Sequence, residues 1–280
     1  MNIRMPAVAG QFYPATGKKL REYFEEIPEK RSGSKVFPVE GKQIIGGVVP
    51  HAGYVYSGFH AARFFELLGS SGHDFDTAVV INPNHTGRGP EIALDPNDAW
   101  ETPLGQVMLD RELTDLLPFP QSPEAHDREH SGEVMLPFLQ YFIRHSFRIL
   151  PVTMGVQSAG NAKKIAIEIY RHARDLGRKI VIIASSDFSH FLSPELGHRM
   201  DEYVLNEILA LNTEGVATQV NTHDVSVCGF GPIMTLMEYS ILTCGNPKIE
   251  LLSRGHSGEV IPSRSVVDYI TLLFYSDRSS

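Results

Sequence analysis

The sequence predicts an α/β fold, a three-layer α/β/α sandwich with a mainly parallel central sheet. Short runs of β-branched and other apolar residues recur along the chain, and stretches with the apolar periodicity of helices separate them. Most of these runs are apolar throughout rather than alternating, which is typical of parallel strands buried on both faces. The intervening helices would supply the two covering layers.

The predicted elements follow one another in this alternating order. Strands are predicted at 43–49 (QIIGGVV), 77–81 (TAVVI), 147–152 (FRILPV), 179–184 (KIVIIA), 248–253 and 266–274. Helices are predicted at 18–26, 59–68, 111–117, 132–144, 161–176, 197–211 and 231–242. The last two strands lie close together in the chain, so we expect them to be an antiparallel addition to the sheet. Residues 28–41 are polar, contain several helix and strand breakers, and predict a loop.

Composition restricts the classes of function. The chain has 280 residues and a net charge of −8, and its longest basic runs are Lys18-Lys19 and Lys163-Lys164. A nucleic-acid interface needs clustered Lys and Arg, so we expect no nucleic-acid partner. No apolar stretch approaches the length of a membrane span, and the first residues lack the apolar segment of a signal peptide. We therefore expect a cytoplasmic protein in which Cys228 and Cys244 are free thiols.

Imidazole and carboxylate groups follow three of the predicted strands. The loop PHAGYVYSG carries His51, the loop NPNHTGRG carries His85, and SSDFSH carries Asp187 and His190. Ligands of open α/β sheets bind just beyond the carboxyl ends of the strands. The sequence therefore predicts that these side chains share one pocket at that edge.

Two further residues are candidates for this pocket. Cys228, in SVCGFGPI, precedes a predicted helix whose dipole would favour the thiolate, although a small buried hydrophobe is the alternative. Cys244 fits only that alternative. His130, in DREHSGE, either lines the pocket and contacts substrate or lies on the surface.

The motifs PHAGYVYSG, NPNHTG, WETPLG, EHSGEVMLPF, PVTMG, SSDFSH and CGFGPI resemble, in order and spacing, those of the Memo family. Microbial members of that family are also called AmmeMemoRadiSam system protein B. The resemblance implies one Memo-like domain over 1–280, with a fold similar to the class III extradiol ring-cleaving dioxygenases, which use non-haem iron. It also implies metal ligands at His51, His85 and Cys228. Asp187 and His190 would border the metal, with His190 in the place of the acid/base imidazole.

The sequence departs from the animal form of the family at two places. NPNHT contains only His85 where that form has two consecutive histidines, and GFGPI lacks a histidine before its proline. Two imidazoles and a thiolate suit Fe(II), Cu or Zn rather than Mg or Ca. Because Cys228 would replace the usual carboxylate, the set shifts toward copper. His190 would transfer protons, and Asp187 would supply an oxygen ligand or orient His190 through a hydrogen bond.

Three functions are consistent with these residues. The first is a metal-dependent redox enzyme that uses iron or copper with oxygen or a phenolic substrate. The second is a zinc-dependent hydrolase with His190 as the base. The third is a non-catalytic module that binds a peptide, a metabolite or a metal. The resemblance also implies a radical SAM protein and an AMMECR1-like protein as partners.

Overall fold

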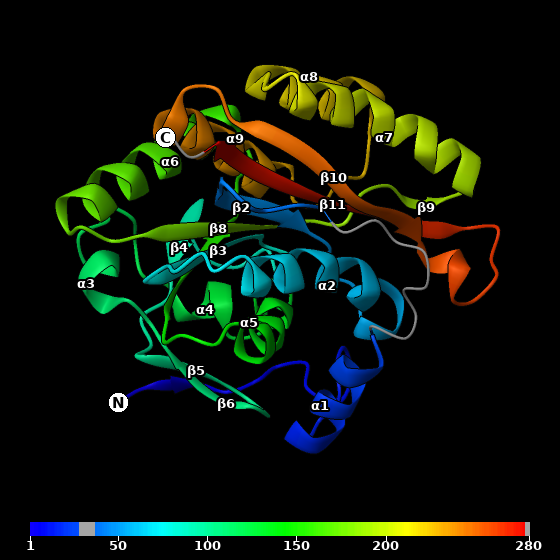
Figure 1. The fold of residues 1–280 in the computed structure, drawn as a ribbon. Helices are drawn as coiled ribbons and strands as arrows, with labels where there is room; N and C mark the ends of the chain where they lie inside the picture. Colours follow the sequence, from blue (N-terminus) through cyan, green and yellow to red (C-terminus); the bar gives the residue numbers. More distant parts are fainter. Residues whose placement is uncertain (28–36, 278–280) are drawn as a thin grey trace.

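The computed structural model describes residues 1–27 and 37–277. Its main sheet has the strand order β10-β11-β2-β8-β3-β7-β4, with β9 paired to β11, and a second sheet has the order β1-β5-β6 (Figure 1). The strands are β1 (Ile3–Arg4), β2 (Lys42–Val49), β3 (Thr77–Pro83), β4 (Ile92–Leu94), β5 (Ala99–Thr102), β6 (Gly105–Met108), β7 (Arg148–Met154), β8 (Ile180–Ser185), β9 (His190–Leu192), β10 (Lys248–His256) and β11 (Val266–Asp277). The helices are α1 (Gly17–Glu26), α2 (Tyr54–Ser70), α3 (Arg111–Thr114), α4 (Pro123–His126), α5 (Leu136–Phe142), α6 (Ala159–Asp175), α7 (Pro194–Leu209), α8 (Thr213–His223) and α9 (Phe230–Cys244), with 3₁₀ turns at Glu133–Met135 and Ser257–Glu259.

The centre of the main sheet is parallel and its edges are antiparallel. β2, β8, β3 and β7 run parallel to one another, whereas β4 runs antiparallel to β7 and β11 runs antiparallel to β2. β10 pairs antiparallel with β11, so the predicted antiparallel addition at the end of the chain is confirmed. The α/β fold with a layered sheet is confirmed as well, although the sheet is more mixed than the prediction because β4 was not foreseen.

Each central strand contributes to two separate hydrophobic cores. In β3, Val79 and Ile81 enter the core formed with α6 to α9, whereas Ala78 and Val80 enter the core formed with α1, α2 and α5. Figure 1 shows these two sets of helices on opposite faces of the sheet. Burying each large aliphatic side chain contributes about 1.5–3 kcal/mol. Apolar residues are therefore favoured at every position, which is why the strands read as uninterrupted apolar runs.

Several elements differ from the predicted ones. α2 begins at Tyr54, inside the PHAGYVYSG motif and five residues earlier than predicted. The predicted helix at 132–144 is a 3₁₀ turn followed by α5, in which Pro137 occupies the first turn, where its missing N–H costs no helical hydrogen bond. The predicted helix at 111–117 ends at Thr114. Of the predicted loop at 28–41, residues 28–36 lie outside the described residues, and 37–41 contain no helix or strand.

The N-terminal strand is anchored to the segment that precedes α5 by one buried arginine. Arg4 donates from Nη1 to Glu133 at 2.7 Å, from Nε to the His126 carbonyl, and from Nη2 to the Glu129 carbonyl. Its guanidinium also lies 4.2 Å from the centre of the Trp100 ring. Because Arg4 and Glu133 are both buried, this ion pair is shielded from water. The contacts fix residues 126–133, which reach the candidate site described below.

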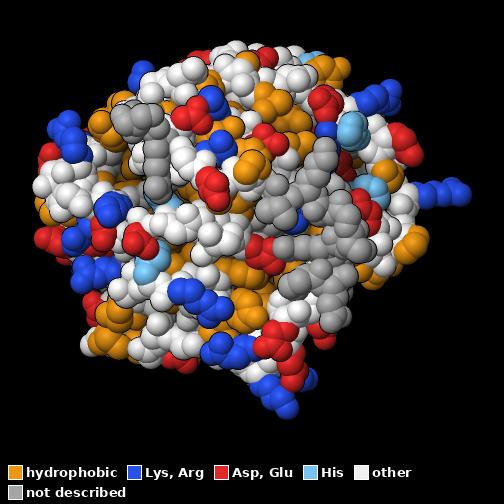
Figure 2. All heavy atoms as spheres, in the orientation of Figure 1, with side chains coloured by type: hydrophobic (Ala, Val, Ile, Leu, Met, Phe, Trp, Pro, Cys, Tyr) orange, Lys and Arg blue, Asp and Glu red, His pale blue; other side chains and the backbone are white. Residues whose placement is uncertain are grey.

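On the face of the molecule seen in Figure 2, Lys and Arg side chains are intermixed with Asp and Glu, so positive and negative charges alternate over it. Within 1–27 and 37–277, no helix combines the length and apolarity that crossing a bilayer requires.

Candidate metal centre

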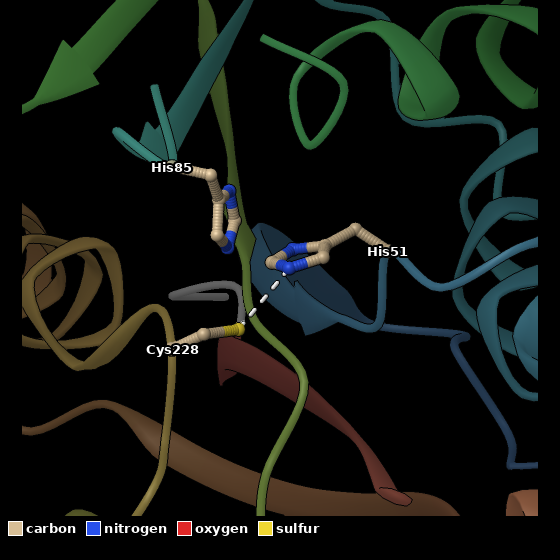
Figure 3. A group of neighbouring side chains, drawn as sticks. All are labelled: His51, His85 and Cys228. Carbon is tan, nitrogen blue, oxygen red and sulfur yellow. Dashed lines mark hydrogen bonds between the residues drawn. The ribbon is translucent and has the colours of Figure 1, made fainter. Parts of the chain in front are cut away.

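Three side chains from separate parts of the chain converge at the carboxyl edge of the parallel strands. His51 follows β2, His85 follows β3, and Cys228 lies just before α9. One potential ligand atom from each residue lies within 4.8 Å of the other two. Figure 3 shows the two imidazoles and the thiol directed toward a common point. The strand-end rule predicted that His51 and His85 meet at this edge, and the resemblance predicted that Cys228 joins them.

The ring orientation of His51 is fixed by two serines. Its Nδ1 lies 2.7 Å from Ser185 Oγ, and that hydroxyl donates its proton to the Ser131 carbonyl at 2.8 Å. Since a hydroxyl has one proton, Ser185 can only accept from His51, so Nδ1 carries the hydrogen. Nε2 is left unprotonated, 3.1 Å from Cys228 Sγ. Burial, followed by the neighbouring imidazoles, lowers the pKa of His51 well below its usual value, which keeps the ring neutral.

His85 is held in the same tautomer by a carboxylate. Its Nδ1 donates to Glu129 Oε1 at 2.9 Å, and its backbone N–H donates to Oε2 at 2.6 Å. Burial acts to raise the pKa of Glu129, but the hydrogen bond and the electrostatic effect of the nearby His85 ring, and the hydrogen bonds from Ser131, lower it to about 2. Glu129 is therefore an anion that accepts the Nδ1 proton, and Nε2 of His85 is free to bind a metal.

Close packing of the backbone places the Cys228 thiol. A Cβ on the next residue, Gly229, would overlap the backbone oxygen of Ser185, so only glycine lets the chain approach β8 this closely. The sulfur accepts a hydrogen bond from the Asp187 N–H at 3.2 Å. Burial, and then the charge of Asp187, raise the pKa of Cys228 well above its usual value. The protonated thiol therefore donates to His51, whereas a coordinated metal ion would deprotonate it.

Asp187 and His190 border the centre, but they are not joined as predicted. Asp187 Oδ1 accepts from the backbone N–H groups of His51 at 2.7 Å and Ala52 at 3.3 Å, so it holds the loop that carries His51. Burial raises the pKa of Asp187 to about 6. His190 donates from Nδ1 to the Ser226 carbonyl at 2.8 Å. Of the two roles predicted for Asp187, the hydrogen bond that would orient His190 is not formed, because Ser226 orients that ring, whereas the role as an oxygen ligand stays a prediction.

A pocket of about 540 Å³ opens beside these residues. Its polar lining includes His51, His85, His130, Asp187 and His190, together with three serines, and its apolar lining includes Phe12, Tyr56, Phe191, Ile261, Val266 and Tyr269. His130 is half-buried, and its ring centre lies 4.6 Å from that of His85 and 4.7 Å from that of Phe12. Of its two predicted positions, His130 therefore occupies the one in the pocket.

The mouth of the pocket carries a backbone conformation that a large residue seldom adopts. Phe191 has φ of +61° and its side chain is 78% exposed. Left-handed backbone at a non-glycine residue costs about 1–2 kcal/mol. An exposed aromatic side chain in such a conformation points to a role in the pocket rather than in folding.

Sequence reasoning missed the residues that orient the histidines. Ser185 lies in the SSDFSH motif, and Glu129 and Ser131 flank His130 in DREHSGE, so the motifs contained them. Ser226 lies two residues before Cys228. Their roles depend on contacts between distant segments, and a local pattern does not reveal such contacts.

Two imidazole nitrogens and one sulfur form a donor set that suits a transition metal. Bonds from such an ion to these atoms are about 2.0–2.3 Å long, so ligands of one ion lie about 3–4 Å apart. The spacing of His51, His85 and Cys228 is compatible with that requirement after small side-chain movements. His85, Glu129 and His130 form a second group within 4.8 Å. In that group, however, Glu129 already accepts the Nδ1 proton of His85.

Comparison with known proteins extends over almost the whole chain. A profile of the family described as Memo-like protein matches residues 4–273. A MEMO1 family protein of Methanococcoides burtonii is 39% identical over 97% of this chain and 99% of its own. A MEMO1 family protein of Archaeoglobus fulgidus is 38% identical over the same shares of both chains. The solved structure of an uncharacterized Escherichia coli K12 protein aligns with a TM-score of 0.48 and 13% identity, over 76% of this chain and 91% of that one. From the full-length match to the profile and to these relatives, the chain belongs to the Memo family.

Proposed function

We propose that this Memo family protein binds one iron or copper ion and acts as a metal-dependent oxidoreductase on a ligand in the adjoining pocket. The ligands would be Nε2 of His51, Nε2 of His85 and Sγ of Cys228. The observation that carries the proposal is that Nδ1 of each imidazole is hydrogen-bonded to an acceptor, while the two rings and the thiol each offer a ligand atom within 4.8 Å of the other two. This arrangement is typical of metal-binding histidines.

The donor set decides between classes of ion. Thiolate and imidazole suit iron, copper and zinc, whereas Mg and Ca prefer oxygen ligands. Iron or copper would supply the one-electron chemistry that no side chain in the pocket offers. With three protein donors, further coordination positions stay available to a ligand. The pocket of about 540 Å³ beside His51 and His85 is large enough for a small organic molecule or the end of a peptide.

The side chains of the pocket would bind this ligand and move its protons. With Nδ1 of His190 bonded to the Ser226 carbonyl, Nε2 is the nitrogen that can accept a proton from a ligand hydroxyl or return it. Phe12, Phe191 and Tyr269 would contact the apolar part of the ligand and exclude water from it. Asp187 would keep the His51 loop in place through its two backbone hydrogen bonds.

Metal content tests the proposal directly. Protein purified without added metal should contain about one iron or copper per chain, measured by elemental analysis. Cys228→Ser and His85→Ala should lose it while keeping the circular dichroism of the wild type. Cys244→Ser is the matched control, because Cys244 is the second thiol and lies at the opposite end of α9, so this variant should keep its metal.

Activity provides the second arm of the test. Protein loaded anaerobically with Fe(II) or Cu(I) should consume oxygen when a catechol and air-saturated buffer are then added, and His190→Ala should keep the metal but lose turnover. Equal metal content in the wild type and Cys228→Ser would refute the metal centre. Zinc alone in freshly purified protein would refute the redox assignment and favour hydrolysis with His190 as the base.

A further inference from the structure

Both candidate imidazole ligands are oriented through one short segment, residues 129–131, in which Glu129 and Ser131 are buried. Glu129 accepts the Nδ1 proton of His85 directly. The Ser131 carbonyl accepts the proton of Ser185, whose oxygen in turn accepts the Nδ1 proton of His51. We propose that Glu129 is a positioning residue of the metal centre, which fixes the tautomer of His85 and holds the Ser131 backbone that fixes the tautomer of His51. This inference rests on the proposed metal centre.

The contacts of Glu129 are those of a group that orients ligands. One oxygen accepts from the backbone N–H of His85 at 2.6 Å, and the other accepts from His85 Nδ1 at 2.9 Å. The second oxygen also accepts from the Ser131 N–H at 3.0 Å and from the Ser131 hydroxyl at 2.6 Å. The donors to this carboxylate thus come from His85, a candidate ligand, and from Ser131, whose carbonyl is linked through Ser185 to the other candidate ligand, His51. It is 2% exposed, so water does not compete for these donors.

These hydrogen bonds have a consequence for metal binding. A neutral imidazole has one proton, and its placement on Nδ1 leaves the lone pair on Nε2. An anionic acceptor at Nδ1 also increases the electron density that the ring offers to a metal. Without Glu129, His85 would distribute its proton between the two nitrogens, and the Ser131 turn would lose its two hydrogen bonds to the carboxylate.

A second buried glutamate, Glu133, lies four positions after Glu129 and provides a matched comparison. Its carboxylate accepts from Arg4, from the backbone N–H groups of Ala7 and Val8, and from the Tyr13 hydroxyl. These donors all belong to the N-terminal segment and not to a candidate ligand. Glu133 therefore anchors the N-terminus, whereas Glu129 acts on the metal centre.

The experiment compares Glu129→Gln with Glu133→Gln. Both substitutions keep the shape of the side chain, remove one negative charge, and replace one acceptor oxygen with an NH2 group that faces the existing donors. The tautomers of His51 and His85 are measured in metal-free protein by ¹⁵N-resolved long-range NMR of the rings. Wild type should show Nδ1–H for both. Glu129→Gln should convert His85 to a mixture of tautomers, and Glu133→Gln should leave both rings unchanged while lowering the urea midpoint.

Metal affinity is measured separately, by competition with a chelator for Fe(II) and Cu(I). Glu129→Gln should bind about 10–100-fold more weakly than wild type. Ser185→Ala should change the tautomer of His51 alone, which keeps the inference testable if Glu129→Gln does not fold. Wild-type tautomers in Glu129→Gln, or equal tautomer changes in both glutamate variants, would overturn the assignment of Glu129. If the wild type binds no metal, the proposed function fails, while the tautomers of the metal-free protein still decide the role of Glu129.

Discussion

Replacing Arg4 with methionine tests whether the N-terminal strand is held by its buried ion pair. Both side chains of the Arg4–Glu133 pair are almost inaccessible, at 1% and 0% exposure, and the two groups are 2.7 Å apart. Removing one partner of a buried pair costs about 3–5 kcal/mol, because the other charge stays buried. The Ala7 and Val8 N–H groups continue to stabilise Glu133, which favours the lower end of that range.

Two further hydrogen bonds add to this cost. The carbonyls of His126 and Glu129 would each lose a charged donor, at about 1 kcal/mol or more per bond. Methionine can still pack on the Trp100 ring, so little apolar contact is lost. The sum is about 5 kcal/mol, a large part of the stability of a typical domain. For a chain of this size, that corresponds to a fall in Tm of about 10 °C.

Urea unfolding followed by circular dichroism measures the loss, with the slope checked to show that the denatured state is unchanged. The double variant R4M/E133Q is the control: it should recover about 2 kcal/mol, because it no longer buries an unpaired charge. A loss below about 1 kcal/mol for R4M, or no recovery in the double variant, would refute the reasoning.

Three more predictions concern the pocket and its surroundings. Asp268 is hydrogen-bonded to Asp201, and burial followed by the charge of Asp201 raises the pKa of Asp268 to about 8. The folded state thus binds a proton that the unfolded state releases above pH 4, so the free energy of unfolding should fall as the pH rises from 4 through 8. Asp268→Asn should flatten that slope in urea titrations, and an unchanged slope would contradict the assignment. Gly229→Ala should lower the free energy of unfolding by about 2–4 kcal/mol and abolish metal retention, since its Cβ would overlap the Ser185 carbonyl. Wild-type metal content in this variant would show that the metal centre does not need the close approach of Gly229 to β8. Phe191→Gly should leave the free energy of unfolding unchanged or raise it by up to about 1 kcal/mol, because φ of +61° suits glycine. The same variant should bind a ligand in the pocket more weakly. A destabilised variant would mean that the aromatic ring supports the fold.

The parts of the fold that the sequence predicts well are those determined by burial on both faces. The runs at 77–81 and 179–184 are largely apolar because their successive side chains pack into the two cores on opposite faces of the sheet. Each run overlaps a central strand. The short strands at Ile3–Arg4 and Ile92–Leu94 could not be foreseen in this way. Each is too short to show a period, and each exists because a distant segment supplies its hydrogen bonds.

The residues of the candidate site likewise divide into those that the sequence predicts and those that it does not. His51, His85 and Asp187 were predictable, because parallel strands end at one edge and the following loops must meet there. The place of Glu129 was not predictable, because it reaches His85 from a turn that follows neither strand in the sequence. The resemblance supplied the grouping of Cys228 with the two histidines. The radical SAM and AMMECR1-like partners stay predictions, since contacts within one chain do not test them.

The position of β2 in the sheet has a consequence for synthesis of the protein. β2 carries His51 at its end, and it lies between β8 and β11, with Val48 opposite both Ala184 and Leu272. Both neighbours are translated long after β2, and at ribosomal rates the interval up to β11 lasts roughly 10–40 s. During that time an apolar strand with unpaired edges awaits its partners, which is a condition that promotes aggregation. We expect that added chaperones that shield nascent chains will increase the yield of folded protein.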